Sequence, residues 1–122
     1  MKALDKLVSK AKRDKSVLAV MVFGSYARGE RHKDIDICLV LKKETGNGAM
    51  SRKRLAYVSE SGLDVHVFQQ MPLYIRVRVL REGKILFCRD MDALYDIASR
   101  TVREFAYFEP AYKGYLEAVK HG

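Results

Sequence analysis

An uninterrupted apolar run, residues 17 to 23 (Val-Leu-Ala-Val-Met-Val-Phe), constrains the fold of this chain more than any other segment. The run is rich in β-branched valine, and such runs are typical of strands that are buried on both faces. It stops at Gly24-Ser25, a pair that favours a turn. The sequence therefore predicts a strand whose two faces are both covered by other elements, and a turn at its end.

The remaining pattern predicts a single compact α/β unit. We expect strands and helices to alternate, with strands over residues 35 to 41, 63 to 68 and 84 to 88, and helices over 2 to 14, over 52 to 60 and from an N-cap at Asp90. Residues 42 to 51 contain a Thr-Gly-Asn-Gly turn signal, which predicts a loop. We assign all of residues 1–122 to one domain that ends in a helical segment at about 90–120.

The two prolines bear on the helices. Residues 72 to 80 fit a strand by alternation, yet Pro72 suits a helix N-terminus and three apolar residues share one helical face, so both alternatives stay open. Glu109 precedes Pro110 and is biased away from helical geometry. The last long helix is therefore predicted to break before Pro110, with a further helical turn or two beyond it.

The composition is that of an ordinary soluble protein. No apolar run among the 122 residues reaches the roughly 18 that a membrane span needs, and the N-terminus does not resemble a signal peptide. Cys38 and Cys88 stand among apolar neighbours and are interpreted as reduced core thiols. We therefore expect a cytoplasmic protein that has no contact with a membrane.

The formal net charge is +8, and much of it lies near the N-terminus. Residues 2 to 15 hold six basic residues and two acidic ones, on a segment whose apolar residues form one helical face. The simplest interpretation is a solvated cationic helix face. An electropositive surface also suits a chain that holds a triphosphate or docks on an acidic partner.

The chemistry of the chain is predicted to centre on Gly24-Ser25 and the pair Asp34 and Asp36. Gly24 lacks a Cβ and lets the backbone approach a phosphate closely, and Ser25 adds a hydroxyl donor. Arg28 would neutralise phosphate charge, although a solvated Arg fits the sequence equally well. Two aspartates two residues apart on a strand point to the same face and repel each other unless a cation lies between them. Mg²⁺ is the usual such cation beside nucleotide phosphates.

Asp64 is the third candidate acid, because it too begins an apolar strand. A third carboxylate beside the first two would complete a two-metal site for phosphoryl or nucleotidyl transfer. His66 lies on the same strand face, but we interpret it as a half-buried structural residue since Mg²⁺ prefers oxygen ligands. His32, in a polar loop, is most simply exposed.

Together, Gly24-Ser25, Arg28-Gly29, Asp34-x-Asp36 and Asp64 resemble the polymerase-β-type nucleotidyltransferase superfamily. The short chain and its C-terminal segment resemble the minimal nucleotidyltransferase (MNT) branch. The resemblance implies a mixed sheet flanked by helices, and a helix for residues 72 to 80. It also implies a nucleoside triphosphate such as ATP, held with Mg²⁺ by Gly24, Ser25, Asp34 and Asp36, with Asp64 as the third acid.

MNT proteins are typically paired with a HEPN-domain ribonuclease as antitoxin and toxin. The resemblance therefore implies an adenylyltransferase that places AMP on a tyrosine of such a partner. The loop from Tyr26 to Lys33 is shorter than in the commonest family form, and Lys33 stands where that form has Ser. This motivates a second hypothesis, a non-catalytic antitoxin that neutralises its partner by occlusion. RNA binding through the basic N-terminal helix is a third, weaker hypothesis.

Overall fold

The computed structural model describes residues 2–24 and 35–121, and four strands within them form one mixed sheet. The strands run in the order β3-β2-β1-β4, with bounds β1 Val17–Phe23, β2 Asp36–Leu41, β3 Asp64–Val67 and β4 Lys84–Cys88. The central strand β1 is antiparallel to both of its neighbours, whereas β2 and β3 are parallel. The predicted mixed sheet flanked by helices is confirmed.

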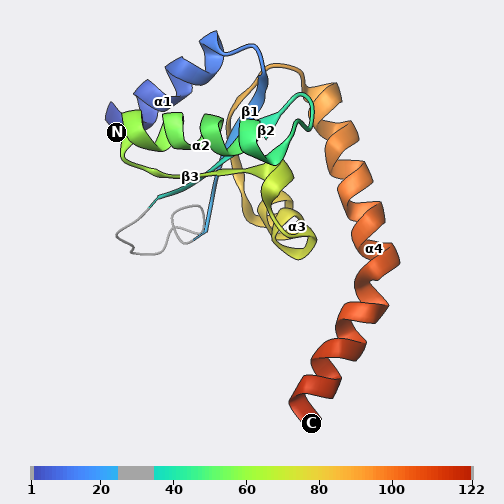
Figure 1. The fold of residues 1–122 in the computed structure, drawn as a ribbon. Helices are drawn as coiled ribbons and strands as arrows, with labels where there is room; N and C mark the ends of the chain where they lie inside the picture. Colours follow the sequence, from blue (N-terminus) through green and yellow to red (C-terminus); the bar gives the residue numbers. More distant parts are fainter. Residues whose placement is uncertain (1, 25–34, 122) are drawn as a thin grey trace.

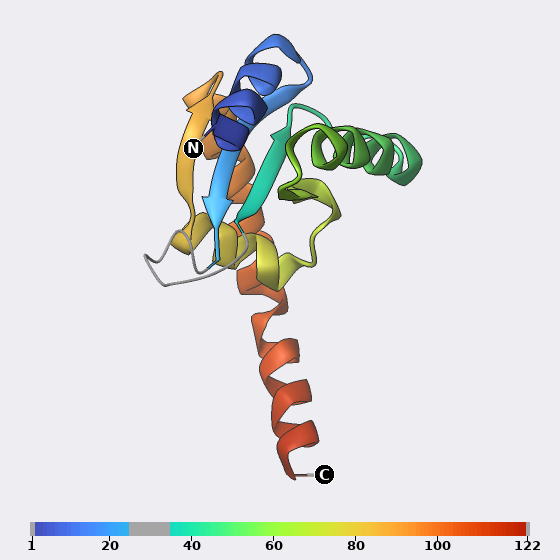
Figure 2. The same cartoon turned by 90° about the vertical axis from the view of Figure 1, so that its left-hand side faces the viewer.

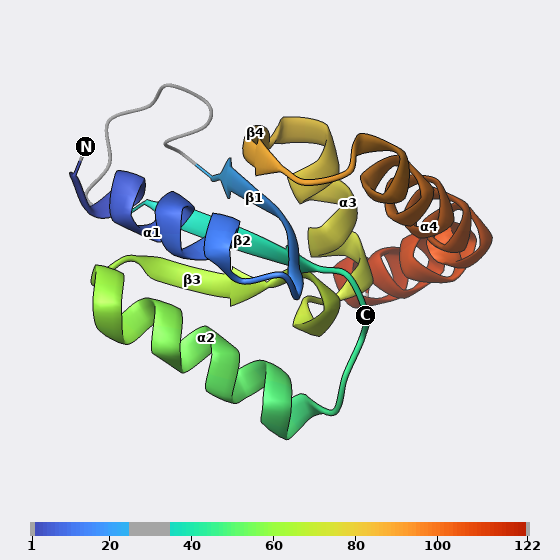
Figure 3. The same ribbon diagram turned by 90° about the horizontal axis from the view of Figure 1, so that it is seen from above.

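Helices cover both faces of this sheet (Figure 3). Helices α1 (Lys2–Arg13) and α2 (Asn47–Ser61) lie on one face, and α3 (Leu73–Glu82) and the start of α4 (Met91–His121) lie on the other. Strand β1 sends Val20 and Val22 into the first layer and Ala19 and Met21 into the second, because successive side chains alternate between faces. The prediction of a strand buried on both faces is therefore confirmed.

Helix α2 provides the crossover that the parallel strands β2 and β3 require. It begins at Asn47, inside the segment predicted as a loop, so that prediction is wrong for the last residues of the segment. The glycines around Asn47 suggested a turn, but Met50 is buried in the core and holds the first turn of the helix against the sheet. The helix ends where Gly62, with φ +70°, donates its N–H to the carbonyl of Val58 at 2.8 Å.

The ambiguous segment after Pro72 is a helix. Pro72 takes the N-cap position of α3, where its missing N–H costs nothing, and Leu73 and Val77 are buried on one face. The expectation drawn from the family resemblance is thus confirmed. The N-cap predicted for the next helix is confirmed as well, since Asp90 Oδ1 accepts hydrogen bonds from the backbone N–H groups of Asp92 and Ala93.

The predicted break before Pro110 is wrong, because α4 continues through that residue. A proline inside a helix removes the hydrogen bond to the carbonyl four residues earlier, here that of Ala106. Both residues are exposed, so water can satisfy the freed carbonyl. Figure 1 shows the consequence: α4 runs on as one long helix whose second half leaves the body of the protein.

Polar contacts join the segment after α1 to α2. The carboxylate of Asp14 accepts hydrogen bonds from Lys53 Nζ at 2.8 Å, Tyr57 OH at 3.0 Å and Ser16 Oγ at 2.6 Å. Burial alone would raise the pKa of Asp14, but the hydrogen bonds from Lys53, Ser16 and Tyr57 outweigh it and lower the pKa to about 2. Asp14 thus stays ionised and anchors α2.

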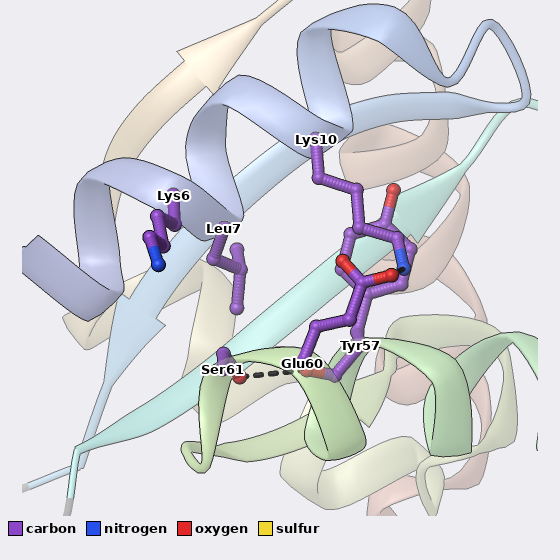
Figure 4. A pocket seen from close by; sticks show the side chains of 6 residues that line it. All are labelled: Lys6, Leu7, Lys10, Tyr57, Glu60 and Ser61. Atoms are coloured by element: carbon purple, nitrogen blue, oxygen red, sulfur yellow. Dashed lines mark hydrogen bonds and ion pairs between the residues drawn. The ribbon is translucent and has the colours of Figure 1, made fainter.

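Figure 4 shows the hollow that remains between α1 and α2. It has a volume of about 220 Å³. Lys10 crosses it, with Nζ 2.8 Å from Glu60 Oε1 and 4.6 Å from the centroid of the Tyr57 ring. Through these contacts the side chain of Lys10 packs α1 against α2. Among residues 2–24 and 35–121, no helix combines the length and apolar character needed to cross a membrane.

Candidate functional site

Asp36 and Asp64 are the first residues of two parallel strands, and they stand opposite each other in the sheet. The next pair on the same face, Cys38 and His66, points toward α3 and α4, where Cys38 is part of the core. Because side chains alternate, both carboxylates project from this same face. Strand pairing, rather than chain proximity, thus brings together two acids that are 28 residues apart.

His66 joins this pair. Its Nε2 atom lies 3.0 Å from Asp64 Oδ1, and one ligand atom from each of Asp36, Asp64 and His66 falls within 4.8 Å of the others. The ring of Phe23 packs edge-on to the imidazole, with centroids 5.9 Å apart. Phe23 therefore fixes the plane of the ring, and His66 fixes the carboxylate of Asp64.

The environment keeps Asp64 charged. Partial burial pushes its pKa upward, but hydrogen bonds with Asp36 and His66 and the nearby charges of His66 and Arg54 outweigh burial, so that the pKa of Asp64 lies below its ordinary value. Arg54 is itself fixed, since its Nε donates to the carbonyl of Val65 at 2.7 Å. An ionised carboxylate is the form that binds a cation.

Gly24 closes the site at the end of β1. Its φ is +76°, and a Cβ added there would lie 2.5 Å from Asp36 Oδ2. The left-handed conformation and the missing side chain are therefore both needed to let the backbone pass against the carboxylate of Asp36. The predicted approach of Gly24 to a phosphate stays a prediction, and the group that the Gly24 backbone approaches in this structure is the carboxylate of Asp36.

Two hollows open beside the carboxylates, separated by Phe23 and Ile75, which line both. The first, of about 320 Å³, is also lined by Gly24 and Asp36, together with Arg78 and Glu82 of α3. The second has a volume of about 430 Å³, and its further lining residues are Ser51, Arg54, His66, Val67, Gln70, Met71 and Pro72. The site therefore offers two neighbouring spaces, one lined by Asp36 and the other by His66.

The structure brings together three of the residues that the sequence analysis singled out, Gly24, Asp36 and Asp64. The others, Ser25, Arg28, Asp34 and His32, lie outside the described residues. His66, which we interpreted as a half-buried structural residue, is partly buried and contacts Asp64. Its position two residues after Asp64 on an alternating strand was the signal for this contact. Nothing in the sequence pattern indicated that Arg54, Arg78 and Glu82 lie near the site, because α2 and α3 bring them there from other parts of the chain.

The donor set fits a magnesium ion. Mg²⁺ is bound in proteins by one or two carboxylates and otherwise by water and phosphate oxygens. Asp36 and Asp64 supply the two carboxylates, and the side chain of Asp64 is 47% exposed, which leaves room for water and substrate oxygens. His66 is better suited to orient Asp64 than to bind this metal, because imidazole favours softer ions.

Comparison with known proteins finds a matching family and a relative that are both described as nucleotide transferases. The family described as "Polymerase beta, Nucleotidyltransferase" matches residues 5–92. A proposed protein adenylyltransferase of Methanocaldococcus jannaschii is 30% identical over 80 residues, which cover 62% of this chain and 60% of that relative. The chain thus spans about three fifths of the length of the curated relative it matches.

Solved structures share the fold. A chain from a crystal structure of a toxin–antitoxin with AMP-PNP superposes with a TM-score of 0.72 at 21% identity, covering 94% of this chain and 97% of that one. A chain from the complex of a tri-AMPylated Shewanella oneidensis HEPN toxin with its MNT antitoxin gives 0.72 at 20% identity, with coverages of 98% and 99%. At these identities the likeness concerns the fold alone.

Proposed function

We propose that this chain, which belongs to the polymerase beta nucleotidyltransferase family, transfers AMP from ATP to a hydroxyl group of a partner protein. We take the acceptor to be a tyrosine of a HEPN-domain ribonuclease, for which the chain would act as antitoxin. The M. jannaschii relative and the Shewanella complex support this choice, since their names refer to protein adenylylation and to an AMPylated HEPN toxin.

The pairing of Asp36 with Asp64 beside Gly24 carries the proposal. Two carboxylates are held within reach of one cation, and a glycine whose backbone tolerates close approach ends the neighbouring strand. This combination of acids and turn serves phosphoryl and nucleotidyl transfer, where catalysis consists mainly of positioning and charge stabilisation.

Asp36 and Asp64, with Asp34 as a further ligand, would hold Mg²⁺, in a two-metal arrangement when a second ion binds. The bound ions would neutralise the charge that develops on the phosphates. His66 and Phe23 keep the Asp64 carboxylate in a fixed orientation toward the site. Gly24, Ser25 and Arg28 would hold the triphosphate.

The reaction follows from these roles. The acceptor oxygen forms a bond to the α-phosphorus of ATP, while the bond from that phosphorus to the oxygen bridging toward the β-phosphate breaks. Asp64 orients the acceptor hydroxyl and takes its proton, and pyrophosphate leaves. The two hollows that share Phe23 and Ile75 would give the nucleotide and the acceptor separate places, one beside Asp36 and the other beside His66.

The test is to incubate the protein with ATP, Mg²⁺ and a purified HEPN-domain ribonuclease from the same organism, and to measure the intact mass of the latter. We expect a mass increase of one AMP, or a multiple of it, and its loss in Asp36→Asn and Asp64→Asn. Asp5→Asn, which removes an exposed carboxylate on α1, is the matched control. Equal labelling by wild type and Asp36→Asn would refute the mechanism.

The alternative is a non-catalytic antitoxin that neutralises its partner by occlusion, and the exposed apolar second half of α4 favours it. On this hypothesis Asp36→Asn would still neutralise the ribonuclease at a one-to-one ratio. On the catalytic hypothesis, a small amount of wild type would inactivate a large excess of ribonuclease, and only with ATP present.

We also place the protein in the cytoplasm. Cys38 and Cys88 are free thiols, and a reducing compartment keeps such thiols unpaired.

A further inference from the structure

The second half of α4 exposes a run of large apolar side chains. Tyr115, Leu116 and Val119 are 69%, 64% and 62% exposed, and Phe108 is 44% exposed. Figures 1 and 2 show that this part of the helix has left the sheet and projects beyond it. An isolated helix of this length is marginal in water, so its stability depends on packing of its apolar face.

The exposed residues continue a stripe that is already buried in the first half of the helix. Apolar or small residues recur at alternating spacings of four and three, at positions 94, 98, 101, 105, 108, 112, 115 and 119. Leu94 and Thr101, early in the stripe, are buried against the body of the protein. Spacings of three and four define the seam along which two helices pack. The pattern therefore predicts that another helix covers the repeat positions in the second half of α4, which we call the distal stripe (positions 105, 108, 112, 115 and 119).

A hollow lies where the distal stripe meets α3. It has a volume of about 850 Å³, and Tyr74 of α3 and Phe105, Phe108 and Leu116 of α4 are among its lining residues. Tyr74 is 55% exposed. A hollow of this kind suits the large apolar side chains with which a helix anchors itself in a groove.

Charge repulsion argues against a second copy of this chain as the partner that covers the distal stripe. Each copy carries a formal net charge of +8, so two copies repel each other. In a parallel pair, the repeat would also place Glu104 of one copy across from Glu109 of the other, which is a like-charge contact at the flanking positions of the seam. Within residues 105–119 the only charged residues are Glu109, Lys113 and Glu117, so the stripe itself is nearly neutral and suits the apolar face of a helix from another protein.

The position of the stripe relative to the carboxylates points to the acceptor. Asp36 and Asp64 project from the sheet face that α3 and α4 cover. In Figures 1 and 2 the second half of α4 extends past the end of the sheet where β1 stops and β2 begins, and Gly24 and Asp36 lie at these strand ends. A protein held on the stripe would therefore lie next to the proposed catalytic end.

We propose that the distal stripe is the docking surface for the protein that accepts AMP, and that this protein presents an amphipathic helix to it. The inference rests on the proposed function for the identity of the occupant. It adds that α4 recruits the acceptor, whereas the strand ends that carry Asp36 and Asp64 perform the transfer.

The test compares two substitutions of the same kind on the same helix. Tyr115→Glu places a carboxylate in the stripe, and Tyr95→Glu places one on the same helix at a position that is 72% exposed and outside the repeat. Both side chains are exposed, so both variants are expected to fold. The probe is a purified HEPN-domain ribonuclease from the same organism, its binding measured by calorimetry and the AMP transferred to it by intact mass.

We expect Tyr115→Glu to raise both Kd and the KM for this acceptor at least tenfold, with kcat within twofold of wild type, and Tyr95→Glu to leave all three within twofold. Equal behaviour of the two variants would overturn the docking surface, even if wild type transfers AMP. Stripe-dependent binding without any AMP transfer would instead overturn the proposed function and leave the docking surface supported. A wild-type dimer in sedimentation that Tyr115→Glu converts to monomer would show that the occupant is a second copy, against the proposal.

Discussion

Replacing Gly24 with alanine tests whether the turn after β1 is built around Asp36. Gly24 and Gly62 both have a left-handed backbone, with φ +76° and +70°. In either place alanine costs about 1–2 kcal/mol of folding free energy, because its Cβ crowds the following carbonyl oxygen. Gly62, at the end of α2, is therefore a matched control for backbone strain.

The two sites differ in what the new methyl group would meet. At Gly24 the Cβ would lie 2.5 Å from Asp36 Oδ2, whereas at Gly62 no described atom lies within 4 Å. The carboxylate of Asp36 must therefore move by roughly 1 Å in Gly24→Ala, and a misplacement of that size costs on the order of 100-fold in rate. Gly62→Ala should lose a similar amount of stability and keep its rate within twofold.

The assay has two parts. Urea unfolding gives the free energy of unfolding of each variant, and AMP transfer at a temperature where both variants are folded gives the rate. We expect similar losses of stability, and a loss of rate in Gly24→Ala alone. If the two variants transfer AMP equally well, the close approach of Gly24 to Asp36 has no catalytic meaning.

Three further predictions concern the framework around the site. The lowered pKa of Asp14, about 2 against an ordinary value of 3.8, means that its carboxylate stabilises the fold above about pH 4 and that this contribution disappears as pH falls through 2. Asp14→Asn should therefore lose about 1 kcal/mol at pH 6, a value reduced for solvent screening, and the difference from wild type in urea unfolding should vanish near pH 2. Arg89 donates to the carbonyls of Val17, Ala11 and Lys12 at 2.9–3.2 Å, so Arg89→Lys, which lacks the planar fork, should lower the free energy of unfolding by about 1–2 kcal/mol in the same measurement. Pro110→Ala restores a helical donor and should raise amide-exchange protection in the second half of α4 by up to about 3 kcal/mol, with AMP transfer within twofold of wild type.

The sequence pattern correctly predicted those elements whose structure depends mainly on residues that are close together in the chain. The run from Val17 to Phe23 is buried on both faces and shows it by being apolar throughout. Asp90 was predicted as an N-cap because capping involves only the next few residues. The break predicted before Pro110 was wrong, because the hydrogen bond that proline removes from an exposed helix can be replaced by one to water.

The candidate site could be predicted only in part, because its contacts depend on how separate strands pair. Candidate acids were evident from their rarity in strands, but the contact between Asp36 and Asp64 depends on which residue of β2 faces which residue of β3. That register is decided by packing of α2 across both strands. His66 was discounted on its preference for softer metals, although alternation already placed it beside Asp64.

The parallel ladder between β2 and β3 also determines where this protein tolerates insertions. The alignment of Asp36 with Asp64 is set by the ladder, and the segment between Leu41 and Asn47 only connects its ends. Extra residues in that exposed connection would lengthen it without displacing either acid. One extra residue within β2, by contrast, would turn every following side chain to the opposite face, so that core residues such as Cys38 and Val40 would exchange layers. Relatives with the same chemistry should therefore vary in length between β2 and α2, and keep the length of β2 itself.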